Sequence, residues 1–301
     1  MTATLDHRVA AAAARSPSLM RDLVALSKPG ITRMNVLMVA GGLALAGTHP
    51  GWSVIVGVLL GSSLAIAAAN TLNQYIERDG DRDMTRTASR PLPTGRMRPE
   101  LALHFGRGLA FASIAVLATT VNLLTAGLAL LAMLSYVLVY TPLKRITPLA
   151  VVIGAVPGAV PPLMGWTAAT NSIDLPGLAL FGILLAWQIP HFLAISLFRF
   201  EDYKRAGIKT VPVVRGDRAA KWQSVAWSVV LLLVSLALVP LGVAGSLYGG
   251  VAAVLGTAYL GYSLVGLKQS SDAAWARRYF FASLIYLPAL MLALAVDVTV
   301  L

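Results

Sequence analysis

The sequence predicts an all-α membrane protein, a polytopic helical bundle with about nine transmembrane helices. Hydrophobic residues make up 57% of the 301 residues and charged residues only 12%, against about 25% charged residues in a typical soluble domain. The apolar residues form repeated runs of roughly 20, the length that crosses about 30 Å of hydrocarbon. Cysteine is absent, which excludes disulfides and thiolate chemistry.

The expected helices follow one another without an intervening soluble domain. We predict a cytoplasmic N-terminal tail at residues 1–28 and a single transmembrane domain at 29–301. Glycines at helix-packing intervals indicate close contacts between helices; these are Gly57, Gly61, Gly154, Gly158, Gly250, Gly256 and Gly261. The helices are expected at about 30–47, 52–76, 101–119, 122–141, 148–168, 176–198, 222–242, 246–265 and 278–299.

The positive charges indicate the orientation of the bundle. With a cytoplasmic N-terminus, the tail, the helix ends and alternate loops hold all 24 Lys and Arg residues, and the opposite loops hold none. Membrane insertion therefore explains the net charge of +11, and no nucleic acid partner is expected. We expect a multi-pass protein of a bacterial inner membrane; a mitochondrial inner membrane is the alternative, disfavoured because the tail lacks a convincing transit pattern.

The main polar stretch, residues 69–99, holds four of the thirteen acidic residues and six arginines. Asn73, Glu77 and Asp81 are four residues apart, so on a continuous helix each step turns by about 40° and all three share one face. Such oxygen ligands suit Mg²⁺, which also takes the oxygens of a substrate phosphate as ligands. The arginines would pair with the phosphate charge that the metal leaves uncovered. A solvated loop whose charges pair with one another is the alternative.

A second mixed-charge stretch follows the sixth expected helix and includes Glu201 and Asp202. Two acidic clusters on one membrane face could hold two Mg²⁺ ions around one diphosphate. We therefore predict cytoplasmic active-site loops at 77–100 and 199–221. A polar, arginine-flanked site at the mouth of an apolar bundle suits a prenyl diphosphate, which joins a charged group to a long hydrocarbon.

Several separated motifs carry a family resemblance. The pattern of Asn73, Glu77 and Asp81 resembles the first aspartate-rich motif of the UbiA superfamily of intramembrane prenyltransferases. Further segments resemble the superfamily's haem branch, the protohaem IX farnesyltransferases or haem O synthases. They are Asn70-x-x-Asn73, Asp81-Arg82-x-Met84-x-Arg86-Thr87-x-x-Arg90-Pro91-Leu92, Tyr140-Thr141-x-x-Lys144-Arg145, Pro190-His191-Phe192 and Asp202-Tyr203-x-x-Ala206-Gly207-Ile208 with Pro212.

The resemblance implies a Mg²⁺-dependent transfer of farnesyl from farnesyl diphosphate to a vinyl group of haem B. Water adds at the neighbouring vinyl carbon, giving haem O for terminal oxidases. Haem A synthase or a terminal oxidase would then be a partner. The implied catalytic residues are Asn73, Glu77, Asp81 and Asp202, with Glu201 as a further metal ligand; the implied diphosphate contacts are Arg86, Arg90, Lys144, Arg145 and Lys204.

Two polar residues within apolar helices are candidates for haem contact. His191 is ionisable and lies beside Pro190, and imidazole commonly binds haem iron. A hydrogen bond from His191 to a carbonyl that Pro190 leaves free is the structural alternative. Asn70 either serves the site or bonds a neighbouring helix.

Two other functions stay open at this level. One is a related prenyltransferase acting on a quinone precursor or another aromatic acceptor. The other is a transporter, disfavoured because charged residues near the membrane midplane, expected of many ion pathways, are nearly absent.

Overall fold

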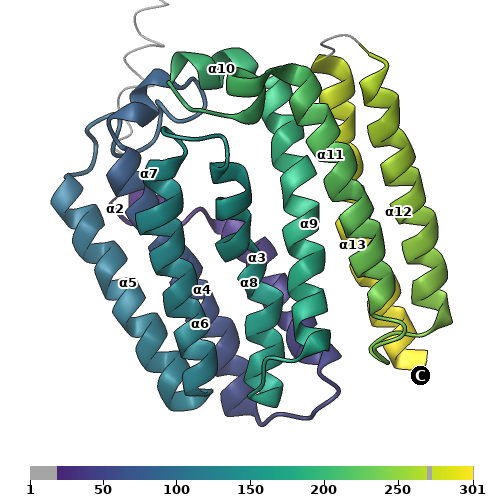
Figure 1. The fold of residues 1–301 in the computed structure, drawn as a ribbon. Helices are drawn as coiled ribbons and strands as arrows, with labels where there is room; N and C mark the ends of the chain where they lie inside the picture. The colour runs from purple at the N-terminus through teal and green to yellow at the C-terminus, as the bar shows by residue number, and fades with distance from the viewer. Residues whose placement is uncertain (1–18, 270–272, 301) are drawn as a thin grey trace, which may run out of the picture.

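The protein is a bundle of long helices, with the short helix α10 lying across one end of it (Figure 1). The computed structural model describes residues 19–269 and 273–300, and all regular structure within them is helical. The elements are α2 (Leu19–Leu26), α3 (Pro29–Leu45), α4 (Trp52–Glu77), η1 (Gly80–Asp83), α5 (Pro99–Thr120), α6 (Leu123–Leu134), η2 (Ser135–Tyr140), α7 (Thr141–Leu143), α8 (Ala150–Thr170), α9 (Leu175–Phe198), α10 (Phe200–Arg205), α11 (Val211–Ala237), α12 (Ser246–Leu267) and α13 (Ala273–Val300).

The predicted membrane-protein fold is confirmed. In the described part of the chain, eight helical stretches are long and apolar enough to cross a membrane, with α6, η2 and α7 forming one of them. The remaining expected helix, the first in the chain, is α3. It has 17 residues, or roughly 26 Å at 1.5 Å per residue. It packs against α4 and α8 and also touches α13, which closes the bundle between its first and last long helices.

Two boundaries differ from the sequence prediction. The expected tail falls partly outside the described residues, and its last part forms the short helix α2. Helix α11 begins before the expected position 222, but Gly216 interrupts it with φ 81° and ψ 166°. Glycine adopts a backbone with positive φ without a steric penalty, so the chain can kink there between the two parts of α11.

Most of the glycines predicted at helix contacts do lie against a neighbouring helix. A Cβ atom at Gly61 would lie 2.6 Å from Leu117, and one at Gly256 would lie 2.5 Å from Leu232. The prediction was wrong for Gly250 and Gly261, where a Cβ would meet nothing within 4 Å. A spacing pattern places glycines on one face of a helix, but only the packing decides whether that face meets a helix.

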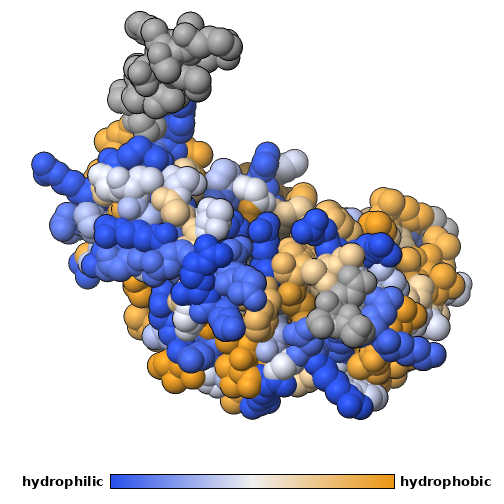
Figure 2. Space-filling model, turned by 90° about the horizontal axis from the view of Figure 1, so that it is seen from above, coloured by the Kyte–Doolittle hydropathy of each residue, from blue (hydrophilic) through white to orange (hydrophobic). Residues whose placement is uncertain are grey.

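The polar end of the bundle carries η1, α10 and the loop between α4 and α5 (Figure 1). Seen from above, hydrophilic residues cover much of this end, and hydrophobic residues show mainly toward its right-hand and lower edges (Figure 2). The active-site loops expected from the sequence therefore lie at one end of an apolar bundle.

Candidate active site

The last turns of α4 carry the first group of predicted site residues. Asn73 and Glu77 are buried, with 3% and 7% of their surfaces exposed. The prediction of one continuous helical face was wrong, because α4 ends at Glu77 and Asp81 belongs to the 3₁₀ turn η1. Gly80 favours this break, since glycine is a poor helix former. Asp81 is nevertheless 5% exposed, so the turn returns its carboxylate to the interior.

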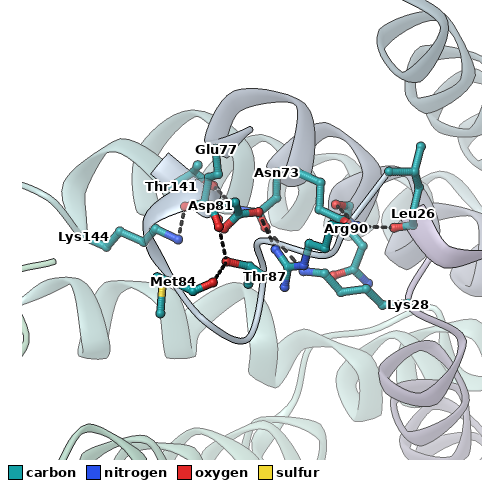
Figure 3. Close-up of polar contacts among 12 residues, drawn as sticks. Leu26, Lys28, Asn73, Glu77, Asp81, Met84, Thr87, Arg90, Thr141 and Lys144 are labelled. Atoms are coloured by element: carbon teal, nitrogen blue, oxygen red, sulfur yellow. Dashed lines mark hydrogen bonds and ion pairs between the residues drawn. The ribbon is translucent and has the colours of Figure 1, made fainter. Parts of the chain in front are cut away.

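Each of the two carboxylates is paired with a basic side chain (Figure 3). Glu77 forms an ion pair with Lys144, which follows α7. Asp81 accepts a hydrogen bond from Nη1 of Arg90 at 2.6 Å, and its backbone oxygen accepts one from the Thr87 hydroxyl at 2.7 Å. The contacts of Asp81 hold the following loop against η1, and that of Glu77 ties the end of α4 to the residue after α7.

Asn73 joins three parts of the chain at this site (Figure 3). Its amide nitrogen donates to the Thr141 hydroxyl at 3.1 Å, and its amide oxygen accepts from Nζ of Lys28 at 3.4 Å. Thr141 in turn donates to the carbonyl of Tyr136 at 2.8 Å. It follows η2, a π-helical segment of six residues, and such segments are frequent at functional sites.

Cations crowd around these acceptors. Burial lowers the pKa of Lys28 to about 7, and the charge of Arg90 acts in the same direction. Burial likewise lowers the pKa of Lys144 to about 7, followed by the charges of Lys28 and Arg145. Lys28 also has a left-handed backbone, with φ 47° and ψ 67°, and such non-glycine outliers often occur at functional sites. A bound anion would relieve this repulsion between like charges.

The second polar loop packs onto the first. Thr85 donates to Asp202 at 3.5 Å, and Asp202 lies between Arg199 at 3.5 Å and Arg205 at 3.6 Å. A small apolar cluster of Met84, Ala206 and Ile208, with Tyr203 against it, fills the space between the loops. The two stretches that the sequence predicted as active-site loops are thus in direct contact.

Residues after α7 link both loops. The backbone N–H of Lys209 donates to the carbonyl of Lys144 at 2.9 Å, and Nη1 of Arg145 donates to the carbonyl of Ala206 at 3.2 Å. Arg145 also lies against Gly80 in η1. The connection between α7 and α8 therefore holds the first loop, the second loop and the end of α4 in one assembly.

The side chains present fit Mg²⁺ only together with a phosphate. Within residues 19–269 and 273–300, no three His, Cys, Asp or Glu side chains are grouped closely enough to hold a metal. Mg²⁺, however, typically takes one or two protein carboxylates and completes its shell with water and phosphate oxygens. Glu77 and Asp81, with the amide oxygen of Asn73, supply hard oxygen donors of this kind. Glu201 is exposed on α10.

The predicted haem-contact residues lie on different helices. His191 on α9 is 9% exposed, and its Nδ1 lies 2.7 Å from the hydroxyl of Ser283 on α13. Its ring stacks on Trp187 with 4.6 Å between centroids. Asn70 is buried on α4, and its backbone carbonyl accepts from the side chain of Gln74 at 3.4 Å.

Sequence comparison decides the family. Residues 35–285 match the UbiA prenyltransferase family. The chain belongs to this family. It is 54% identical over 238 residues to a Sorangium cellulosum protein named protoheme IX farnesyltransferase, covering 79% of this chain and 85% of the relative. A Myxococcus xanthus protein of the same name is 47% identical over 281 residues, covering 93% of this chain and 96% of the relative.

Solved structures of UbiA family members have the same fold. A structure described as digeranylgeranylglyceryl phosphate synthase superposes with a TM-score of 0.81 at 18% identity, covering 94% of this chain and 99% of the other. An Archaeoglobus fulgidus UbiA homologue bound to DMAPP and Mg²⁺ superposes with a TM-score of 0.62, also at 18% identity, covering 91% and 99%. At this identity the likeness establishes the fold of a UbiA family member.

The structure brings together part of the predicted UbiA site. Its centre joins Asn73, Glu77 and Asp81 to Arg90 and Lys144. Two other predicted diphosphate contacts are linked to this centre: the charge of Arg86 acts on Lys28, and Arg145 bridges the loops. Lys204 is exposed on α10, where its ammonium group lies 5.8 Å from the ring of Phe200.

Sequence reasoning missed two residues of this centre. Lys28 was placed in the N-terminal tail, and Thr141 was noted only as part of a motif. The available signal for Lys28 was its position directly before Pro29 at the start of the first membrane helix. Nothing in the local sequence connects either residue to Asn73, because the contacts span 45 and 68 residues.

Proposed function

We propose that this UbiA family member transfers a farnesyl group from farnesyl diphosphate to a vinyl group of haem B. Water adds to the neighbouring vinyl carbon and diphosphate leaves, so that haem B, farnesyl diphosphate and water give haem O and diphosphate. The observation that carries the proposal is the similarity, over most of the chain, to proteins named protoheme IX farnesyltransferase.

The charged centre supports the donor half of this reaction. Lys28, Arg90 and Lys144 are crowded around buried oxygen donors, an arrangement that a diphosphate would stabilise. Arg86, whose charge acts on Lys28, and Arg145, which bridges the two loops, would contact the outer phosphate oxygens. Lys204 would do so from α10. Charge-assisted hydrogen bonds of this kind are about twice as strong as neutral ones, so these cations would stabilise the charge that grows on the departing diphosphate.

Mg²⁺ is part of the proposal. When bound with the diphosphate, it would neutralise charge on the leaving group. Asn73, Glu77 and Asp81 would hold it from the end of α4, and Asp202, with Glu201, would do so from α10. Lys144 and Arg90 keep the carboxylates of Glu77 and Asp81 buried and oriented in the absence of metal.

The bundle supports the remaining requirements. The apolar helices beside the centre would hold the hydrocarbon chain and keep water from the carbocation that forms when the allylic C–O bond breaks. Residues 77–100 and 199–221 act as the active-site loops of the single domain at 29–301. The bacterial relatives and the one-sided Lys and Arg distribution support a bacterial cell membrane with a cytoplasmic N-terminal tail.

The test is a reconstituted reaction. Purified protein in detergent receives haem B, farnesyl diphosphate and Mg²⁺, and haem mass and diphosphate release are followed, with an EDTA control. We expect haem to gain the mass of a farnesyl group plus a hydroxyl group, and EDTA to abolish the gain. Product from an aromatic acceptor but not from haem would reassign the acceptor, and solute flux in liposomes without prenyl transfer would favour a transporter. Haem A synthase and a terminal oxidase have no support in the contacts or the comparisons and are not part of the proposal.

A further inference from the structure

A buried histidine lies in the membrane part of the bundle, outside the charged centre. His191 on α9 is 9% exposed, and its ring centroid lies 4.6 Å from that of Trp187 and 4.7 Å from that of Phe280. Phe280 belongs to α13, which packs along α9. An ionisable side chain at this depth is costly and commonly has a functional role.

The contacts of Ser283 determine which nitrogen of His191 carries the proton. A serine hydroxyl has one hydrogen to donate, and that of Ser283 goes to the carbonyl of Phe280 at 2.6 Å. With its hydrogen given to Phe280, the Ser283 oxygen, 2.7 Å from Nδ1 of His191, accepts from the tautomer that carries the proton on Nδ1. The neutral ring then has a free lone pair on Nε2, to which no residue in the described part of the chain donates a hydrogen bond.

Ser283 is itself held in place. Its backbone carbonyl accepts a hydrogen bond from Nε1 of Trp187 at 2.8 Å, the same side chain that stacks on His191. Trp187 thus contacts the face of the histidine ring and Ser283 its edge. Because Trp187 also bonds Ser283, both contacts depend on the packing of α9 against α13. Metal-binding histidines are commonly oriented in this way, by a hydrogen bond to the nitrogen that does not bind the metal.

Aromatic side chains connect this histidine to the polar end of the bundle. The ring of Phe280 lies 5.6 Å from that of Phe198, the last residue of α9. The guanidinium groups of Arg199 and Arg277 each lie 5.8 Å from the Phe198 ring. His191 and Phe198 are seven residues apart on one helix, or about 10 Å at 1.5 Å per residue. A flat apolar ligand with a metal at its centre and carboxylates at one edge matches this sequence of groups.

We propose that the α9–α13 junction is the porphyrin acceptor site, in which Nε2 of His191 binds the haem iron. Ser283 is a positioning residue that presents this nitrogen, and Arg277 pairs with the porphyrin carboxylates. The inference rests on the proposed function, since it names the site of that acceptor. Arg199 also contacts Asp202, which meets Thr85 of the first loop, so the acceptor site adjoins the diphosphate site.

Optical titration of the detergent-purified protein with haem B tests the iron ligand. We expect His191→Gly to lose the spectrum of histidine-bound haem and free imidazole to restore it. Ser283→Ala should weaken haem binding by about tenfold or more, the usual loss when a partner of a metal-binding histidine is removed, and Ser283→Thr should retain the wild-type spectrum. Ser196→Ala is the matched control, because Ser196 is also buried and bonds the carbonyl three residues earlier.

The same titration with haem B dimethyl ester tests the carboxylate contact. Arg277→Gln should weaken binding of haem B but not of the ester, whereas Arg278→Gln, at the adjacent exposed position, should change neither. A wild-type spectrum and affinity in His191→Gly, at wild-type thermal stability, would overturn this inference and leave the proposed function standing if haem O is still formed. If the wild-type protein binds no haem and forms no haem O, the proposed function fails and this inference fails with it.

Discussion

Gly80 and Arg145 are in direct contact: a Cβ atom at residue 80 would lie 1.6 Å from Nη2 of Arg145. The glycine belongs to the turn that carries Asp81, and the arginine follows the short helix α7. The absence of a side chain at residue 80 therefore allows the guanidinium to lie across the turn. From there it reaches the carbonyl of Ala206 in the second loop.

Gly80→Ala is expected to displace the Arg145 guanidinium without unfolding the protein, because the end of an arginine side chain can move. A charged hydrogen bond contributes about 1.5–3 kcal/mol, so its loss should raise the KM for farnesyl diphosphate roughly ten- to a hundredfold. Steady-state kinetics of Gly80→Ala, Arg145→Ala and the double variant give the measurement. Fully additive effects in the double variant would contradict the assigned contact.

Asp81→Asn should lower turnover on the order of a hundredfold or more, as expected when a group that stabilises transition-state charge is removed. The variant keeps the size of the side chain but weakens both metal binding and the pairing with Arg90. The matched control is Asp79→Asn, since the Asp79 side chain is 73% exposed and lies 3.9 Å from Arg78. Equal rates for the two variants in the haem O assay would remove Asp81 from the site.

Lys28→Met should weaken binding of farnesyl diphosphate, because it removes a half-buried cation that contacts Asn73. Lys28→Gly should weaken binding to the same extent but raise thermal stability, since a left-handed backbone costs a residue with a side chain about 1–2 kcal/mol. Calorimetric titration and thermal unfolding measure the two effects. Lys268→Met, at an exposed position after α12, should change neither; unaltered binding in both Lys28 variants would exclude a diphosphate contact.

Gly165→Ala should destabilise the bundle, because its Cβ would lie 1.9 Å from the backbone carbonyl of Val39 on α3. Backbone cannot move aside as a flexible side chain does, and overpacking of this kind costs typically about 1–3 kcal/mol. Gly127→Ala on α6 is the control, since its Cβ would meet nothing within 4 Å and alanine favours a helix by about 1 kcal/mol. Thermal unfolding in detergent should separate the variants; equal midpoints would contradict the close approach of α3 and α8.

Much of the fold was predictable because each membrane helix requires a run of about 20 apolar residues, which is visible in the sequence. Each long apolar run in the sequence became a helix, and only α3 is shorter than the others. The glycine pattern was less reliable: Gly61 lies against Leu117, but Gly250 faces open space. Burial against lipid and burial against a helix use the same residue types, so composition does not separate them.

The candidate site was predictable in its residues and less so in its arrangement. The spacing of Asn73, Glu77 and Asp81 indicated one helical face, whereas a turn at Gly80 carries the last of them. The spacing argument requires an unbroken helix, but α4 ends at Glu77. The local sequence does not indicate that Arg145 lies against Gly80 in the turn that follows.

The sequence by itself determined the membrane class, the helical series and the polar loops that carry the candidate chemistry. These follow from hydrophobicity and charge, which each short segment expresses independently. Only the tertiary structure decided which side chains meet: Lys28 and Thr141 reach Asn73 across 45 and 68 residues, and Ser283 reaches His191 across 92. Such contacts depend on how helices far apart in the chain pack together, and that packing selects the partners.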